Sequence, residues 1–538
     1  MFDLDAIRRA FSRSEWGARL LRWPASTEPG DAPGLLMIQI DGLSRTQLNK
    51  ALANGEMPFV QRLIQRGEHR LHNLYSGVPS TTPAVQAELF YGVRTAVPAF
   101  GFISKDSGEE VRMLDSEPAA EVERTLATQG RGLLERGAAY ADIFDGGAPR
   151  AHFCSSRLRW DDLMRWRNVA GFAFLLVTNL WSFVRAAMLL VMECGLAVAD
   201  CMDGIFSGRD FAKEVAFVPS RVAVCVLLRE FVRIGAEMDA ARGVPVVHLN
   251  LLGYDEQAHR RGPSSAFAHW SLAGIDECVR RLHGAARRSL RRRYSLVVYS
   301  DHGQEEALPY SKAYGRSIEA AVAAVFDGNE RLQRQRPRRA YGEQRARARW
   351  LLSEQWLDAI SSRFGPDPGS SRPSARVVAM GPVGFVYCER QPASAERGVL
   401  ACALVRDANV PLVLARDDDE EVCAWTATGE YRLPRDAPKL FGAGHPHLAD
   451  VGEDMAALCR HRDAGDFVIC GYRASGPHIS FPLENGAHGG PGHEETRAFA
   501  LLPAGLGDES LYGRERQTNG PDYLRPLDLR RAALSLLG

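Results

Sequence analysis

The chain has 538 residues, of which 45% are hydrophobic, and its Lys+Arg and Asp+Glu totals are both 66. This length provides a large core, either in one enlarged α/β domain with insertions or in two or three domains. The balanced charge excludes a general electrostatic attraction to nucleic acid, so we expect that no nucleic acid partner is required. Ten cysteines without a Cys-x-x-Cys pair argue against a zinc ribbon and fit a reducing compartment.

The N-terminal residues predict a cytoplasmic protein without a signal peptide, because Met1–Arg8 is acidic where a secretory signal is basic, and no apolar stretch follows. Leu35–Ile40 is the first predicted strand, and it ends at Asp41-Gly42. A helix is predicted at Pro58–Arg66. A Ser-Thr-Thr-Pro turn follows about 40 residues after Asp41, and it offers hydroxyls as candidate nucleophiles, because a threonine alkoxide is usable when a metal ion lowers its pKa.

An apolar segment interrupts this pattern. Residues 169–184 are uncharged, and Ala186–Met192 continues the apolar run after Arg185. We consider a buried helical hairpin, an interfacial hairpin that associates with a membrane surface through residues 169–206, and a true membrane span. The span is the least favoured, because a central arginine is costly inside a bilayer.

Two later strands also end in metal ligands. Asp255 and His259 follow the predicted strand Val244–Leu252. Asp301 and His302 follow the predicted strand Ser295–Tyr299, and a long helix is predicted at Ser264–Arg288 between the two strands. The alternation of strands and helices predicts an α/β fold in which helices flank a mainly parallel central sheet. Ligands at the ends of such strands converge at one sheet edge, so we expect Asp41, Asp255 and Asp301 to lie together.

We expect the core to be divided by two insertions. Its parts are residues 30–103, 241–310 and 471–538, separated by a helical region at 104–240 that contains the apolar hairpin and by a linker and small α+β lobe at 311–470. The strands predicted for the lobe are Val377–Val386, Val410–Ala415, Val422–Thr426 and Tyr431–Pro434.

A third histidine, His488, lies in a glycine-rich segment just before the predicted strand Phe499–Leu502. The glycines permit close backbone approach to metals or substrate. His493, in His493-Glu-Glu-Thr, is the alternative third ligand. Together the segments supply two histidines and one aspartate for one metal, and two aspartates, one histidine and a threonine hydroxyl for another. Such sets suit zinc, or alternatively manganese, better than calcium.

These motifs resemble the alkaline phosphatase superfamily, and more closely its branch of type I phosphodiesterases and nucleotide pyrophosphatases. The most specific match is Asp255-x-x-x-His259-x-x-Gly262-Pro263 followed by Asp301-His302-Gly303. The resemblance implies a metal-binding hydrolase with two divalent ions. One is bound by Asp255, His259 and His488, and the other by Asp41, Thr81, Asp301 and His302.

The resemblance also implies that Thr81 attacks phosphorus in line and forms a phospho-threonine that water then hydrolyses. One departure is Ala84, where the phosphodiesterases have an asparagine that holds a phosphate oxygen. We consider Gln86 or Arg94 as a substitute, and substrate-binding residues stay unassigned.

Several alternatives stay open. Within the superfamily they are a phosphomonoesterase and a phosphotransferase that passes the phosphoryl group to an alcohol or lipid head group. From a different class, the alternative is a membrane-associated, non-catalytic metal-binding protein. The expected partner is a small phosphate ester or a lipid head group, and neither the leaving group nor the oligomeric state follows from the residues.

Overall fold

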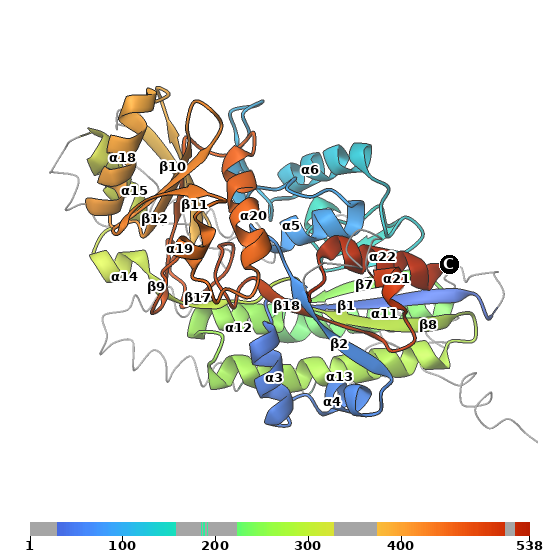
Figure 1. Ribbon diagram of the computed structural model, residues 1–538. Coiled ribbons are helices and arrows are strands. Elements are labelled where there is room, and N and C mark those ends of the chain that lie inside the picture. The colour runs from blue at the N-terminus through green and yellow to red at the C-terminus, as the bar shows by residue number, and fades with distance from the viewer. Residues whose placement is uncertain are drawn as a thin grey trace, which may run out of the picture.

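The computed structural model describes residues 30–157, 223–327, 374–511 and 522–538, with four single positions between 184 and 191. Its largest sheet has seven strands in the order β2-β18-β8-β1-β7-β5-β6 (Figure 1). They are β1 (Pro33–Ile40), β2 (His69–Tyr75), β5 (Ala138–Tyr140), β6 (Arg150–His152), β7 (Val246–Leu251), β8 (Arg293–Tyr299) and β18 (Arg497–Pro503). Strands β8, β1, β7, β5 and β6 are parallel, and β18 is antiparallel to both β8 and β2. The predicted α/β class with a mainly parallel central sheet is confirmed.

The central strands form where the sequence is almost continuously apolar. In β1, every residue from Gly34 to Ile40 is buried, and all six residues of β7 are buried as well. Continuous apolar runs are typical of parallel strands covered on both faces. The predicted strands therefore agree with β1, β7 and β8 to within two residues at each end.

Helices cover both faces of the sheet. One face packs against α3 (Arg45–Ala53), α4 (Pro58–Gln65), α11 (Arg229–Arg242), α12 (Gly253–Arg261) and α13 (Ala266–Arg288). The other packs against α5 (Thr82–Gln86), the π-helical turn η1 (Ala87–Tyr91), α6 (Ser116–Gln129) and α22 (Pro526–Leu537). Figure 1 shows α3, α4 and α13 below the sheet and α5, α6 and α22 above it. The starts of α3 and α13 are capped by Ser44 and Ser265, whose side chains accept from backbone N–H groups.

A separate lobe contains a six-stranded antiparallel sheet in the order β10-β11-β15-β12-β13-β14. Its elements are β10 (Ala375–Ala379), β11 (Val383–Cys388), β12 (Leu412–Arg416), β13 (Val422–Thr426), β14 (Gly429–Leu433) and β15 (Phe467–Cys470), with α15 (Ile318–Asp327), α18 (Ser394–Arg406), α19 (Ala437–Phe441) and α20 (Leu448–Arg460). The single strand predicted at Val377–Val386 is wrong. Gly381 and Pro382 turn the chain there, so the apolar run forms the hairpin β10–β11.

Smaller elements connect the lobe to the core. They include β9 (Glu305–Pro309), α14 (Tyr310–Tyr314), β16 (His478–Ser480) and β17 (Gly486–Ala487), and the three strands form a sheet in the order β16-β9-β17. Two strands of the central sheet, β5 and β6, fall inside the segment 104–240 that was expected to be a helical insertion. The predicted domain boundaries stay a prediction.

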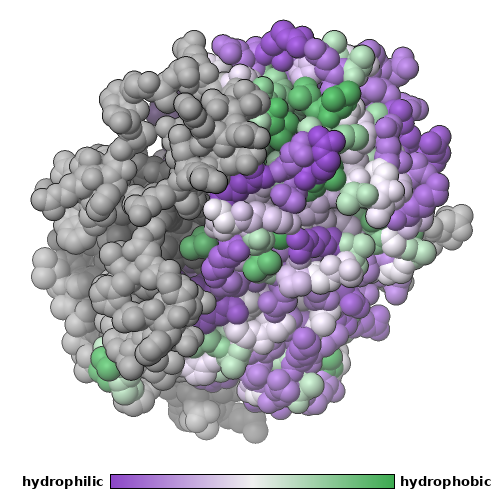
Figure 2. Space-filling model, turned by 90° about the vertical axis from the view of Figure 1, so that its left-hand side faces the viewer, coloured by the Kyte–Doolittle hydropathy of each residue, from purple (hydrophilic) through white to green (hydrophobic). Residues whose placement is uncertain are grey.

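The apolar segment at 169–206 lies outside the described residues, apart from single helical positions. Among the parts of the chain that the structure describes, no helix is long and apolar enough to cross a membrane. Figure 2 shows one face of the molecule, on which the described side chains are mainly hydrophilic and the apolar ones gather in separate small groups. Membrane-surface association and cytoplasmic location stay predictions.

Candidate metal centre

The predicted ligands come from four segments that meet at the carboxyl edge of the central sheet. Asp41 follows β1, Asp301 and His302 follow β8, Asp255 and His259 lie on α12, and His488 follows β17. All six side chains are buried, with relative exposures of 2% or less. The convergence of strand ends that the sequence predicts is what the structure shows.

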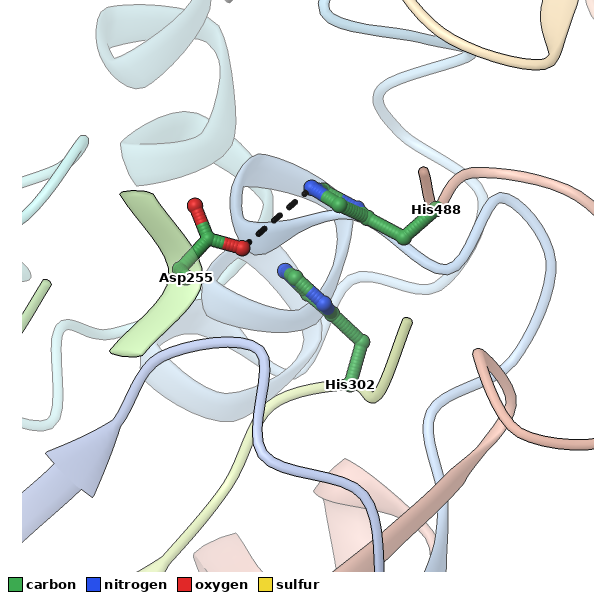
Figure 3. Close-up of side chains that lie close together, drawn as sticks. All are labelled: Asp255, His302 and His488. Atoms are coloured by element: carbon green, nitrogen blue, oxygen red, sulfur yellow. Dashed lines mark ion pairs between the residues drawn. The ribbon is translucent and has the colours of Figure 1, made fainter. Parts of the chain in front are cut away.

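The ligand atoms form two overlapping groups. Asp255, His302 and His488 each offer an atom within 4.8 Å of the others, and the same holds for Asp41, Asp301 and His302. Figure 3 shows the first group: the carboxylate of Asp255 points toward the two imidazole rings, and its Oδ1 lies 3.8 Å from His488 Nε2. His302 is therefore shared by the two groups.

His302 contacts both carboxylates of the second group. Its Nε2 lies 3.5 Å from Asp41 Oδ1 and 3.3 Å from Asp301 Oδ2. Burial lowers the pKa of His302, and the nearby Asp301 carboxylate opposes that shift. Neutral imidazole is the form that binds a metal ion.

The other two histidines are oriented by backbone carbonyls. His259 Nδ1 lies 2.9 Å from Gly486 O, and His488 Nδ1 lies 2.8 Å from Ser80 O. The remaining nitrogen of each ring then faces Asp255, at 3.4 Å for His259 Nε2. Such contacts hold metal-binding histidines in one tautomer and one orientation. His259 lies outside both 4.8 Å groups but next to the first.

The Ser80-Thr81-Thr82 turn lies against two of the three histidines of the centre, His302 and His488. Thr82 Oγ1 is 3.3 Å from His302 Nε2, and the carbonyl of Ser80 contacts His488. Thr81, between them, is 3% exposed, and its Oγ1 has no hydrogen-bond partner among the described residues. A buried hydroxyl without a partner is costly, which indicates that the site has room for a further polar group.

The glycine after Asp41 is required by the close packing of the centre. Gly42 has φ +70°, in the left-handed region that other residues rarely adopt. A Cβ atom at this position would lie 2.5 Å from Asp255 Oδ1, well inside contact distance. Gly42 therefore lets the β1 turn approach the Asp255 carboxylate.

Three residues weighed from the sequence lie apart from the centre. His493 is exposed, and its ring packs against His445 with centroids 4.5 Å apart. Gln86 donates to Asp142 and accepts from the N–H groups of Ile143 and Phe144, and Arg94 forms an ion pair with Asp454. Both side chains are therefore engaged with other residues, and the hypothesis that Gln86 or Arg94 replaces the missing asparagine stays a prediction.

Two polar residues that the sequence interpretation missed contact the ligands directly. Asn250 Nδ2 donates to Asp41 Oδ2 over 2.9 Å, and Gln304 Nε2 donates to both the carboxylate and the carbonyl of Asp255. Asn250 interrupts the apolar strand β7, and such a polar residue in a buried strand is a usable sequence signal. Gln304 carries no comparable signal.

A small apolar crevice borders Thr81 and His488. Its other walls are Pro79, Ala99, Phe100, Met380, Gly381, Val383 and Gly489. Met380 belongs to the β10–β11 turn, so the lobe reaches the edge of the metal centre. The lobe therefore lies where it contacts whatever occupies the space beside the Thr81 hydroxyl.

Comparison with known proteins gives one family match. Residues 142–364 match the family model of type I phosphodiesterase / nucleotide pyrophosphatase. This segment contains Asp255, His259, Asp301 and His302, whereas Asp41, Thr81 and His488 lie outside it. No curated protein matches the chain in sequence.

Two solved structures with a distant likeness to this chain are a phosphonoacetate hydrolase and an ectonucleotide pyrophosphatase / phosphodiesterase. Phosphonoacetate hydrolase from Sinorhizobium meliloti 1021 is 15% identical, with 95% of this chain and 97% of that chain covered and a TM-score of 0.45. Human ectonucleotide pyrophosphatase / phosphodiesterase 5 is 11% identical, with 94% of each chain covered and a TM-score of 0.46.

The prediction of an enzyme that hydrolyses phosphoric esters is confirmed at the level of the matched family. The resemblance predicted from the motifs is confirmed with it, because residues 142–364 match the type I phosphodiesterase / nucleotide pyrophosphatase family.

Proposed function

We propose that the protein is a two-metal-dependent phosphoric ester hydrolase that acts through a phospho-threonine on Thr81. The single observation that carries this proposal is the buried Thr81 hydroxyl, which has no partner among the described residues and lies between contacts to His302 and His488. A nucleophile needs a free hydroxyl beside the groups that activate it.

The residues present fit two divalent cations. Asp301 is buried, and its only ion-pair partner among the described residues is His302, so the site is suited to a positive charge. Asp255, His259 and His488 would hold one ion, and Asp41, Thr81, Asp301 and His302 the other. Nitrogen and oxygen donors in these numbers suit zinc, with manganese as the alternative. When bound, the ions would lower the pKa of the Thr81 hydroxyl and neutralise charge on the phosphoryl group.

The chemistry of the chain itself centres on Thr81. Its Oγ forms a bond to phosphorus as the ester bond to the leaving alcohol breaks, which gives phospho-threonine and the free alcohol. Water then attacks the same phosphorus, the bond to Thr81 Oγ breaks, and the hydroxyl is restored with release of phosphate or a phosphate monoester. Asn250 and Gln304 hold Asp41 and Asp255 in place during both steps.

Hydrolysis of bis-p-nitrophenyl phosphate and of p-nitrophenyl phosphate, measured side by side with and without chelator, tests this proposal. We expect Thr81→Ala to lower kcat at least about 10³-fold. Thr82→Ala is the matched comparison, because it removes the neighbouring hydroxyl, which contacts His302, but leaves the proposed nucleophile; we expect a much smaller loss of kcat than in Thr81→Ala.

The two substrates also separate the alternatives. Faster turnover of the diester supports a phosphodiesterase, and faster turnover of the monoester supports a phosphomonoesterase. Loss of activity in Thr82→Ala but not in Thr81→Ala would refute the assignment of the nucleophile. No turnover by protein that holds two metal ions would favour a transferase or a non-catalytic role.

A further inference from the structure

Two adjacent glutamates, Glu494 and Glu495, connect the segments that carry the metal ligands. They lie in the loop between His488 and β18, in the His493-Glu-Glu-Thr sequence that the proposed mechanism leaves without a role. Glu495 is fully buried, and Glu494 is partly buried. A buried carboxylate is costly unless it accepts several hydrogen bonds, so its contacts show what it is there to hold.

The Glu495 carboxylate closes the loop that carries His488. Its Oε2 accepts from Gly490 N and its Oε1 from Gly492 N, both over 2.7 Å. A Cβ atom on Gly490 or Gly492 would lie 2.8 Å or 2.7 Å from Oε1, so only glycine permits this approach. The loop conformation therefore depends on the carboxylate.

The same carboxylate reaches the nucleophile turn through Ser80. The Ser80 hydroxyl lies 3.3 Å from Glu495 Oε2, donates to Gly490 O over 3.0 Å and accepts from Gly489 N over 2.9 Å. Ser80 is itself fully buried, and its carbonyl contacts His488 Nδ1. One cluster of contacts therefore fixes both the histidine and the residue before Thr81.

The backbone of Glu495 and the side chain of Glu494 reach the remaining strand ends. Glu495 O accepts from Gly303 N over 2.9 Å, directly after His302. Glu494 accepts from Ser44 Oγ over 2.7 Å and from Thr46 Oγ1 over 2.8 Å, in the turn that follows Asp41. The two glutamates thus contact the segments that follow β1, β8 and β17, which carry the proposed ligands outside α12. They also contact the turn that carries Thr81.

We propose that Glu495, assisted by Glu494, is a positioning residue that holds His488, Thr81 and His302 in the arrangement that binds the metal ions. The inference rests on the proposed function, because it assigns these glutamates a role in the same centre. Neither carboxylate touches substrate or metal in this role. Residues that orient metal ligands typically change metal affinity or activity by about 10–100-fold when substituted.

Zinc affinity of the full chain, measured by competition with a chromophoric chelator, tests the proposal. We expect Glu495→Gln to bind zinc about 10–100-fold more weakly, because its amide NH₂ opposes one of the two glycine N–H groups. Glu495→Asp keeps the negative charge but withdraws the carboxylate by one methylene, and we expect it to lose affinity as well. If Glu495→Asp binds zinc with wild-type affinity, the positioning role of Glu495 is wrong, and only its negative charge contributes to zinc binding.

Asp276→Asn is the matched control for general stability. Asp276 is a buried carboxylate that also accepts from two backbone N–H groups, those of Phe59 and Val60, where α13 meets the start of α4. We expect its substitution to lower the unfolding midpoint and leave zinc affinity unchanged. If Glu495→Gln behaves in the same way, with a lower midpoint and wild-type zinc affinity, the proposal is wrong.

A further variant keeps the test decisive if the Glu495 variants do not fold. Ser80→Ala removes only the hydroxyl between Glu495 and the nucleophile turn, and we expect weaker zinc binding; unchanged affinity would refute the proposal. Ester hydrolysis in the same preparations separates the two proposals. Wild-type protein that binds zinc but hydrolyses neither ester contradicts the proposed function, while the zinc affinities still decide the role of Glu495. Wild-type protein that binds neither zinc nor manganese contradicts both.

Discussion

The imidazole rings of His302 and His488 stack with centroids 3.7 Å apart and planes inclined by 16°. The two residues come from segments far apart in the chain, one after β8 and one after β17, and both face the Asp255 carboxylate. Packed together in a buried pocket, these rings and carboxylates form a centre that divalent cations would stabilise.

We therefore expect metal removal to lower stability. A ligand that binds only the folded state stabilises it by about 2.7 kcal/mol at a hundredfold excess over its Kd. Chelator should lower the unfolding midpoint, and zinc or manganese should restore it. Asp301→Ala should abolish metal occupancy at the second site and reduce this shift, as measured by thermal unfolding and metal content. Full metal content with unchanged activity in Asp301→Ala would contradict the ligand assignment.

Gly42→Ala should damage the centre beyond its effect on the backbone. The left-handed conformation costs a non-glycine residue about 1–2 kcal/mol, and the new methyl group would also strike Asp255. Gly55→Ala is the matched control, because Gly55 has φ +71° and no atom within 4 Å of an added Cβ. Both variants should lose stability in urea unfolding, but only Gly42→Ala should lose metal affinity. Equal metal affinity in the two variants would show that Asp255 is not displaced.

Stability should fall as pH rises from about 4.5 to about 8 because of Glu305. Burial, followed by the charge of Glu495, raises the pKa of Glu305 from 4.5 to about 8. In this window the folded protein retains a proton that the unfolded chain has released, so the Glu305 contribution is complete below pH 4.5 and is lost through pH 8. Urea unfolding at several pH values should show a smaller decline in Glu305→Gln than in the wild type. An unchanged slope would indicate that other groups cause it.

Gln86→Ala should affect stability and leave substrate binding unchanged. The Gln86 carbonyl accepts from Ile143 N and Phe144 N, and its amide donates to Gln39 and Asp142. Loss of a partner for buried polar groups costs about 1–3 kcal/mol. We expect a lower free energy of unfolding with KM at the wild-type value. A raised KM at wild-type stability would restore Gln86 as a substrate ligand.

The sequence was sufficient to predict the elements that end in the proposed metal ligands. Largely apolar runs marked β1, β7 and β8, and the polar residues that follow them stood out against that background. Thr81 and His488 followed from motif order, and the structure places both on the wall of one crevice, with His488 also within 4.8 Å of ligand atoms of Asp255 and His302.

Other features depend on contacts that no local pattern encodes. Gln304 meets Asp255 only because α12 packs beside the β8 turn, and Glu495 meets Ser80 only once distant parts of the chain have folded together. The β10–β11 hairpin was missed because its apolar residues continue on both sides of Gly381 and hide the turn. The contacts of Gln86 could not be predicted either, since its distance along the chain from Thr81 gives no information on the direction of its side chain.

The metal centre draws on Asp41, near the start of the described residues, and on His488, near their end. Contacts between such distant positions cost the conformational entropy of the intervening loop, which the rest of the fold must offset. Affinity for the proposed metal ions would therefore report on folding of the whole core, since a nascent chain that has not yet reached the β17 loop lacks His488, one of the proposed ligands.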